Sequence, residues 1–208
     1  MAWFSTHSCS ASIADSRLQP NWPGPMNPSP NLFLIGPMGA GKSSIGRRLA
    51  ERFGLPCVDL DAEIEQRTGA SVATIFEIEG EAGFRRRESD LLAEITARAG
   101  IVLATGGGAV LVPANRALLR ERGFVVWLQA SVEQQLQRLA RDRKRPLLDA
   151  PDRRERLEHL ALERDPIYGE LADCSVGGAG ESCEHAAARV AALLERQWHR
   201  SSTVKENA

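Results

Sequence analysis

Short apolar runs alternate along this chain with longer stretches in which apolar side chains recur every three to four residues. A run of four or five apolar residues suits one buried strand, whereas the longer repeat is typical of a helix packed on one face. This alternation predicts an α/β fold with a five-stranded parallel sheet. The runs cover residues 32–35, 55–59, 101–104, 124–128 and, more weakly, 174–176.

The stretches between these runs predict the helices, and several carry end signals. Ser71 and Ser131 precede helical repeats and can cap them. Pro113 can open a helix, and Gly80 interrupts the longest repeat. The helices are expected from residue 42 onward and at about 62–67, 72–99, 113–122, 132–140, 152–171 and 181–198.

A glycine-rich segment joins the first strand to the first helix. Residues 36–43, Gly-Pro-Met-Gly-Ala-Gly-Lys-Ser, fit the Walker A pattern G-x-x-x-x-G-K-[ST]. Its glycines let backbone N–H groups surround phosphate oxygens, and the helix dipole adds positive potential. Lys42 supplies a charge to the β- and γ-phosphates, and the Ser43 hydroxyl is placed to ligate Mg²⁺. The alternative is a glycine-rich turn that matches by chance.

The second expected strand ends in Asp59-Leu60-Asp61. Carboxylates at the C-terminal end of a strand lie at the edge where α/β sheets bind ligands. In an extended segment these two aspartates share a face, so one could hold Mg²⁺ through water while the other handles a substrate hydroxyl. The alternative is that Asp61 only caps a helix.

Two arginines fall on apolar stripes of expected helices. Arg85 and Glu88 lie on the apolar stripe of the long helix expected after residue 72. Arg164 lies on the apolar stripe of the helix expected over 152–171. An inward arginine needs an anionic partner. Glu88 is one candidate partner for Arg85, and a substrate carboxylate is another.

Three successive glycines, Gly106, Gly107 and Gly108, follow the third strand. Such a run predicts that a ligand or backbone approaches very closely. Its spacing is not G-x-G-x-x-G, so it indicates no dinucleotide fingerprint. A flexible turn is the alternative.

A basic stretch follows the fourth strand and its helix. Residues 138–156 hold eight Lys or Arg and four Asp or Glu. We interpret it as a lid that brings an arginine onto ATP phosphates; a solvated face or a weak RNA patch is the alternative. Arg145 is the candidate, because Pro146 fixes the backbone just beyond it.

Composition narrows the class of protein further. The 208 residues are 43% hydrophobic, which suits one globular domain with a full core. A net charge of −1 provides no field for nucleic acid or membrane, and no stretch approaches the ~20 apolar residues of a membrane span. The four cysteines lack C-x-x-C spacing, which argues against a zinc site and indicates free thiols in a reducing cytoplasm.

The two ends differ from the rest of the chain. Residues 1–30 are rich in proline and serine without an apolar repeat, which is typical of a disordered leader. An equally weighted alternative is that Met26 is the true start. Residues 199–208 are expected to form a frayed tail.

Across residues 31–198 the chain resembles the shikimate kinase family. A Walker A loop alone would indicate only a nucleotide-binding protein, but here further motifs occur in the family's order and approximate spacing. They are Asp59-Leu60-Asp61, Phe84-Arg85-x-x-Glu88, Gly106-Gly107-Gly108, Arg145-Pro146-Leu147-Leu148, and Arg164 before Pro166-x-Tyr168.

For the phosphate donor, the resemblance implies ATP with Mg²⁺. Lys42 and Ser43 serve the nucleotide and the metal, and Asp59 holds a metal-bound water. Arg145 comes from the lid to the transferring phosphate, and Arg138 packs on adenine. The implied nucleotide-binding set is Gly39, Ala40, Gly41, Lys42, Ser43, Ser44, Arg138 and Arg145.

For the acceptor, the resemblance implies shikimate, phosphorylated at its 3-hydroxyl. Asp61 hydrogen-bonds the substrate hydroxyls and is a candidate base, with solvent as the alternative. Arg85 and Arg164 pair with the carboxylate, and the loop of Gly106, Gly107 and Gly108 closes over the same substrate. Lys42, Asp61 and Arg145 are the implied catalytic residues.

The implied fold is a three-layer P-loop NTPase fold, with a substrate-binding insert at about 60–95 and a lid at about 140–152. A cytoplasmic monomer is expected, with no nucleic-acid or membrane partner. The chain departs from the family at one part of the expected adenine site. Residues 175–180 lack the basic side chains that the family often has after the last strand.

Two other functions stay open from the sequence. Another small-metabolite kinase of this fold, for gluconate or a nucleotide, would share the Walker A loop, although Arg85 and Arg164 favour an anionic acceptor. A nucleotide-dependent switch or binding module is the second, but the chain has no guanine-reading N-K-x-D motif. The intact Lys42, Asp59, Asp61 and Arg145 count against an inactive kinase.

Overall fold

The computed structural model describes residues 29–140, 152–178 and 182–198. The expected leader before residue 29, the tail after residue 198 and most of the expected lid lie outside the described residues. No helix in the described ranges is both long and apolar enough to cross a membrane.

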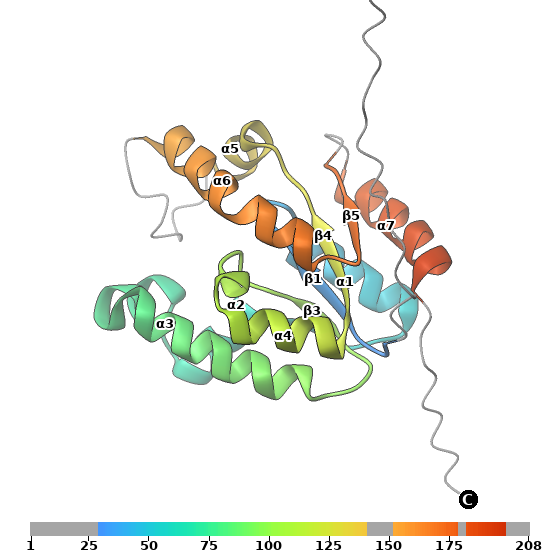
Figure 1. Ribbon diagram of the computed structural model, residues 1–208, viewed down its shortest axis with the longest axis horizontal. Coiled ribbons are helices and arrows are strands. Elements are labelled where there is room, and N and C mark those ends of the chain that lie inside the picture. The colour runs from blue at the N-terminus through green and yellow to red at the C-terminus, as the bar shows by residue number, and fades with distance from the viewer. Residues whose placement is uncertain (1–28, 141–151, 179–181, 199–208) are drawn as a thin grey trace, which may run out of the picture.

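Five parallel strands form one sheet in the order β2-β3-β1-β4-β5 (Figure 1), which confirms the predicted α/β architecture. In this register Leu34 pairs with Ala104 on one side and Val126 on the other, so the C-terminal ends of the strands meet at one edge. The strands are β1 Leu32–Ile35, β2 Cys57–Asp59, β3 Val102–Ala104, β4 Phe124–Leu128 and β5 Cys174–Val176.

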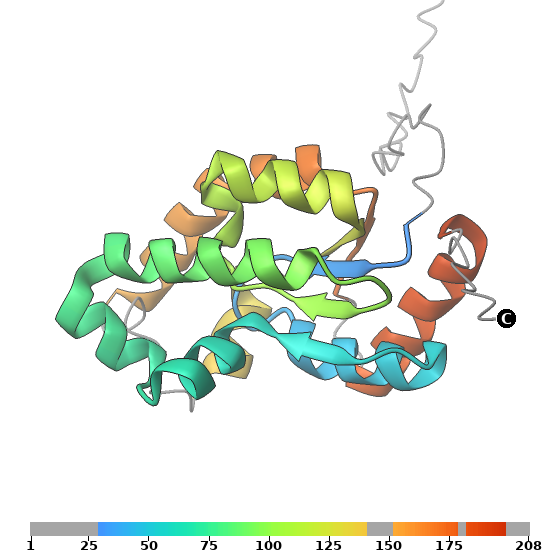
Figure 2. The ribbon, with the colours of Figure 1, turned by 90° about the horizontal axis from the view of Figure 1, so that it is seen from below.

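Helices cover both faces of this sheet, giving three layers (Figure 2). One face carries α1 (Lys42–Phe53) and α7 (Cys183–Gln197). The other carries α3 (Val72–Thr96), α4 (Pro113–Arg122) and α6 (Arg153–Leu171). The short α2 (Leu60–Thr68) packs on α3, and α5 (Val132–Leu139) packs on α6.

The central strand β1 shows why its sequence is apolar throughout. Leu32 and Leu34 pack into the core on the α1 and α7 side, whereas Phe33 and Ile35 pack into the core on the opposite side. Alternate side chains of a strand point to opposite faces, so a strand buried on both needs apolar residues at every position.

The helix ends confirm the sequence signals. The Ser71 hydroxyl accepts a hydrogen bond from the Thr74 N–H, and Ser131 forms a capping box with Gln134. Pro113 opens α4, and α3 is kinked at Gly80, whose φ of 69° and ψ of 178° are not helical. A one-turn 3₁₀ helix over Ala109–Leu111 was not expected.

Candidate active site

The phosphate loop turns the chain from β1 into α1. Gly36 has a φ of +136°, and a Cβ there would lie 2.2 Å from the Leu128 carbonyl oxygen, so only glycine fits. Gly41 is the N-terminal cap of α1, and no side chain of the described residues accepts a hydrogen bond there. The start of α1 therefore suits a phosphate, because helix N-termini bind phosphate through their first N–H groups.

Lys42 is buried under the same loop. Its Nζ donates to the carbonyl oxygens of Gly36 and Pro37, each at 2.8 Å. Ser43 and Ser44 follow on the first turn of α1 and are exposed. The loop thus combines a fixed positive charge with open backbone and hydroxyl groups, as phosphate and a bound cation require.

The two aspartates at the end of β2 and the start of α2 have different roles in the structure. Asp59 ends β2, and its Oδ1 accepts a hydrogen bond from the Ala62 N–H at 3.1 Å, so it caps α2. The expectation of an extended segment with both carboxylates on one face is wrong, because the chain becomes helical at Leu60. Asp61 lies in the first turn of α2, and its Oδ1 is 2.9 Å from the position that a Cβ on Gly106 would occupy.

Three charged side chains form a cluster inside the protein. Arg85 donates from Nη1 to Glu88 Oε2 at 2.6 Å, while Glu88 is fully buried and Arg164 is 5% exposed. Within the described residues, Nε of both arginines and Oε1 of Glu88 have no hydrogen-bond partner. Burial raises the pKa of Glu88, and the nearby Arg85 opposes this shift. Unmatched buried polar groups are costly, which favours a polar, anionic ligand here.

The glycine loop over residues 106–108 lies against this cluster. A Cβ on Gly106 would lie 2.5 Å from Glu88 Oε1, and one on Gly108 would lie 2.1 Å from Arg85 Nη2. A Cβ on Gly107 would lie 3.5 Å from the Gly36 carbonyl oxygen of the phosphate loop. The close approach that the glycines predict is made by charged side chains, and the loop joins the cluster to the phosphate loop.

Tyr168 fixes the glycine loop from α6. Its hydroxyl donates to the Gly107 carbonyl oxygen, and its fully buried ring packs on Trp127 with ring centroids 5.8 Å apart. Burial raises the pKa of this phenol, so it keeps its proton and remains a donor. Arg164 leaves the same helix one turn earlier. One helix therefore presents both an inward arginine and the support of the glycine loop.

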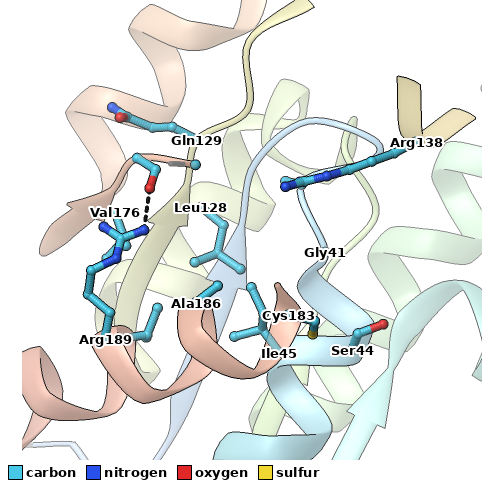
Figure 3. A pocket seen from close by; sticks show the side chains of 14 residues that line it. Gly41, Ser44, Ile45, Leu128, Gln129, Arg138, Val176, Cys183, Ala186 and Arg189 are labelled. Carbon is cyan, nitrogen blue, oxygen red and sulfur yellow. Dashed lines mark hydrogen bonds between the residues drawn. The ribbon is translucent and has the colours of Figure 1, made fainter. Parts of the chain in front are cut away.

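A cavity of about 220 Å³ opens beside the phosphate loop (Figure 3). Ile45, Leu128 and Val176 give it apolar walls, and Gly41 and Ser44 line it on the phosphate-loop side. Arg138 reaches over the loop from α5 (Figure 3), and its Nη1 donates to the Gly39 carbonyl oxygen at 2.8 Å. The other lining residues are Ala40, Gln129, Gly177, Gly178, Cys183, Ala186, Arg189 and Val190.

Most of the residues selected from the sequence therefore lie around one edge of the sheet. Arg145 and most of the lid fall outside the described residues. In the described ranges, no three His, Cys, Asp or Glu side chains gather where they could hold a metal ion. A cation at the phosphate loop would have to take most of its ligands from phosphate and water.

Sequence reasoning missed the residues that support these loops. Tyr168 was noted only as part of a motif, and its apolar setting on α6 is the one signal of an inward hydroxyl. Gln134 lies on a largely polar helix face, and Arg189 is exposed beside the buried stripe of its helix, so no periodicity identifies either residue.

Comparison with known proteins gives a consistent result. A family model described as "Shikimate kinase" matches residues 38–195. The shikimate kinase of Stenotrophomonas maltophilia is 55% identical over 175 residues, covering 84% of this chain and 97% of that protein. That of Xanthomonas campestris pv. campestris is 52% identical over 178 residues, covering 86% and 99%. The solved shikimate kinase from Acinetobacter baumannii in complex with shikimate has a TM-score of 0.79 at 46% identity, covering 81% and 94%.

Proposed function

The chain belongs to the shikimate kinase family and phosphorylates the 3-hydroxyl of shikimate with ATP, and we propose how its residues divide this reaction. The products are shikimate 3-phosphate and ADP, in a step of chorismate and aromatic amino-acid biosynthesis. The main support for this assignment of roles to residues is the buried cluster of Arg85, Glu88 and Arg164 beside the phosphate loop. This cluster provides cationic groups for a substrate carboxylate that binds next to the transferring phosphate.

The donor side holds ATP by its phosphates. The N–H groups at the start of α1 bind phosphate oxygens, and Lys42 moves its hydrogen bonds from loop carbonyls to the β- and γ-phosphates. The Ser43 hydroxyl and the Asp59 carboxylate suit Mg²⁺, which is commonly held by one or two protein oxygens together with phosphates and water. When bound, Mg²⁺ neutralises charge that develops on the phosphates.

The acceptor side holds shikimate by its carboxylate and hydroxyls. Within the described part of the chain, Arg85 and Arg164 each have a buried Nε without a hydrogen-bond partner, although Arg164 Nε lies 3.9 Å from Glu163 Oε2, and both guanidinium groups suit a carboxylate. Asp61, beside Gly106, binds hydroxyl groups and orients the one that attacks. The glycine loop lets the substrate approach both groups closely.

Catalysis then rests on position and charge. Phosphoryl transfer needs little covalent work from the protein, so Lys42 and a lid arginine, for which we propose Arg145, stabilise the charge of the transferring group. Closure over both substrates would exclude water, which would otherwise accept the phosphate. We further propose a substrate-binding region at about 60–95 and a lid at about 140–152. A cytoplasmic monomer remains our expectation.

The first test is acceptor-dependent ADP release from MgATP. Shikimate, gluconate and a nucleoside monophosphate are compared as acceptors, with wild type and Asp61→Asn. We expect turnover with shikimate alone, and loss of turnover in Asp61→Asn while ATP still binds. Activity on another acceptor would overturn the substrate, and tight ATP binding without any transfer would favour a binding module.

A single variant tests the lid. Arg145→Ala should lower kcat far more than it raises KM for shikimate, because this residue is assigned to the transferring phosphate. A change in shikimate affinity alone would contradict that assignment.

A further inference from the structure

One wall of the cavity beside the phosphate loop consists of backbone just beyond β5. Two side chains from different helices hold it. Arg189 Nη2, on α7, donates to the Gly177 carbonyl oxygen at 2.5 Å (Figure 3), and Gln134 Nε2, on α5, donates to the Gly178 carbonyl oxygen at 2.7 Å. Two successive carbonyl groups are thereby fixed in direction.

The side-chain amide of Gln134 is itself held in one orientation. Its Oε1 accepts a hydrogen bond from the Ser131 N–H at 3.0 Å, which fixes the amide so that Nε2 points to the wall. A Cβ on Gly178 would lie 2.7 Å from that Oε1 and 3.1 Å from the Gln129 carbonyl oxygen. At Gly178 the wall therefore lies tight against α5, the helix that also carries Arg138.

The cavity between this wall and Arg138 has the chemistry of a nucleobase site. Ile45, Leu128 and Val176 provide apolar surface, while Arg138 presents a planar guanidinium (Figure 3). A purine ring suits apolar contact combined with a stacked guanidinium. Because Gly41 and Ser44 line the same cavity, a base bound here would be continuous with phosphates on the loop.

We propose that Arg189 and Gln134 are positioning residues that hold the wall at Gly177 and Gly178 against the purine base of ATP. This inference rests on the proposed function, since it assumes that ATP is the phosphate donor. Side chains from α5 and α7 would then hold the wall that contacts the base. A segment after β5 that has no basic side chains can in this way still form a defined base site. Neither positioning residue touches the transferring phosphate.

Arg189→Ala tests this assignment, because Gln134 also caps α5 and its loss would disturb Arg138. The affinity for ATP is measured by titration calorimetry and from KM. Inorganic tripolyphosphate, a competitor that occupies the phosphate loop but has no base, is measured beside it. We expect about a five- to tenfold loss of ATP affinity, as for one hydrogen bond of ordinary strength. Affinity for tripolyphosphate and KM for shikimate should change less than twofold.

Two further variants separate this role from charge and from general stability. Arg196→Ala removes the same charge from the exposed C-terminal part of α7 and should leave ATP affinity unchanged. Arg189→Lys keeps a donor at the end of a flexible chain and should restore part of the affinity. Melting temperatures of all variants are recorded in parallel.

The possible outcomes differ clearly. Equal losses of ATP and tripolyphosphate affinity would overturn the proposal, since they would show a long-range charge effect on the phosphates. Unchanged ATP affinity in Arg189→Ala would also overturn it, as would equal losses for ATP and shikimate. A wild type that binds ATP but does not phosphorylate shikimate would instead refute the proposed function, and the calorimetric comparison would still decide the role of Arg189.

Discussion

The phosphate loop and the buried charge cluster lie next to each other but are built in opposite ways. The loop comes from one continuous segment, and its cation, Lys42, already has backbone carbonyl partners. The cluster gathers Arg85 and Glu88 from α3 with Arg164 from α6, and it has buried polar atoms without hydrogen-bond partners in the described residues. The difference indicates a donor side formed before ligand binds and an acceptor side that the ligand completes.

The largest effect should come from Lys42→Ala. Loss of this charge removes stabilisation of the charge on the transferring phosphoryl group, so kcat should fall by roughly 10³-fold or more. Shikimate affinity, measured by titration in the absence of nucleotide, should be nearly unchanged, because the two sides are built independently. Arg48→Ala, on the exposed face of the same helix, is the control for charge. A large loss of shikimate affinity in Lys42→Ala would show that the two sides are not built independently.

Arg164→Lys tests the acceptor side in the same way. The lysine keeps the charge but loses the planar set of donors that suits a carboxylate. We expect KM for shikimate to rise roughly tenfold to a hundredfold, in line with the loss of charged hydrogen bonds. KM for ATP should stay within twofold. Arg156→Lys, exposed on the same helix, is the matched control, and an equal effect of both changes would remove Arg164 from the site.

The same contrast explains what could be predicted from the sequence. The phosphate loop depends on local backbone geometry, so its contiguous residues were enough to place Lys42 and Ser43. Helical periodicity also predicted that Arg85 and Arg164 point inward, and both side chains are largely buried. That the cluster lies against Gly106 and Gly108 depends on the sheet topology, which no local pattern contains.

One wrong prediction and one missed pair of residues show what could not be predicted from the sequence. The sequence pattern predicts Asp59 and Asp61 in one extended segment. The strand instead ends at Asp59, because the Asp59 side chain caps α2, which begins at Leu60. The supports of the base cavity could not be predicted, because Gln134 and Arg189 act through backbone carbonyls. Which carbonyls they reach depends on how α5 and α7 pack at the end of β5.

Tyr168→Phe should have a smaller effect that sharpens the contrast. The variant keeps the ring but leaves the Gly107 carbonyl without its donor, which costs about 1–3 kcal/mol for a buried group. Part of that cost appears as movement of the glycine loop, so KM for shikimate should rise about fivefold while KM for ATP stays constant. A general loss of stability would instead lower the melting temperature without separating the two KM values.

The chain offers an independent check of this hydroxyl, because Tyr168 is its only tyrosine. Burial raises the pKa of the phenol, so its ionisation, followed by ultraviolet absorbance, should occur well above the usual range in the folded protein. It should return to about 10 in denaturant. Titration at the ordinary pKa in the folded protein would contradict the buried hydrogen bond.

The smallest effect is expected from the pH dependence of stability and concerns Glu88. Its pKa is raised by burial above the ordinary value of 4.5, against the opposing effect of Arg85. The unfolded chain then loses this proton at a lower pH than the folded chain, so the contribution of Glu88 to stability is full below pH 4.5. It is lost as the pH rises through the folded pKa. Glu88→Gln, which resembles the protonated side chain, lacks this dependence.

The measurement is the free energy of unfolding in urea for wild type and Glu88→Gln, at several values between about pH 4 and pH 8. We expect the stability of wild type relative to the variant to decrease as the pH rises. An increase would mean that pairing with Arg85 outweighs burial and that the cluster is satisfied without a ligand. The acceptor side would then be as complete before binding as the phosphate loop, and the contrast between the two sides would fail.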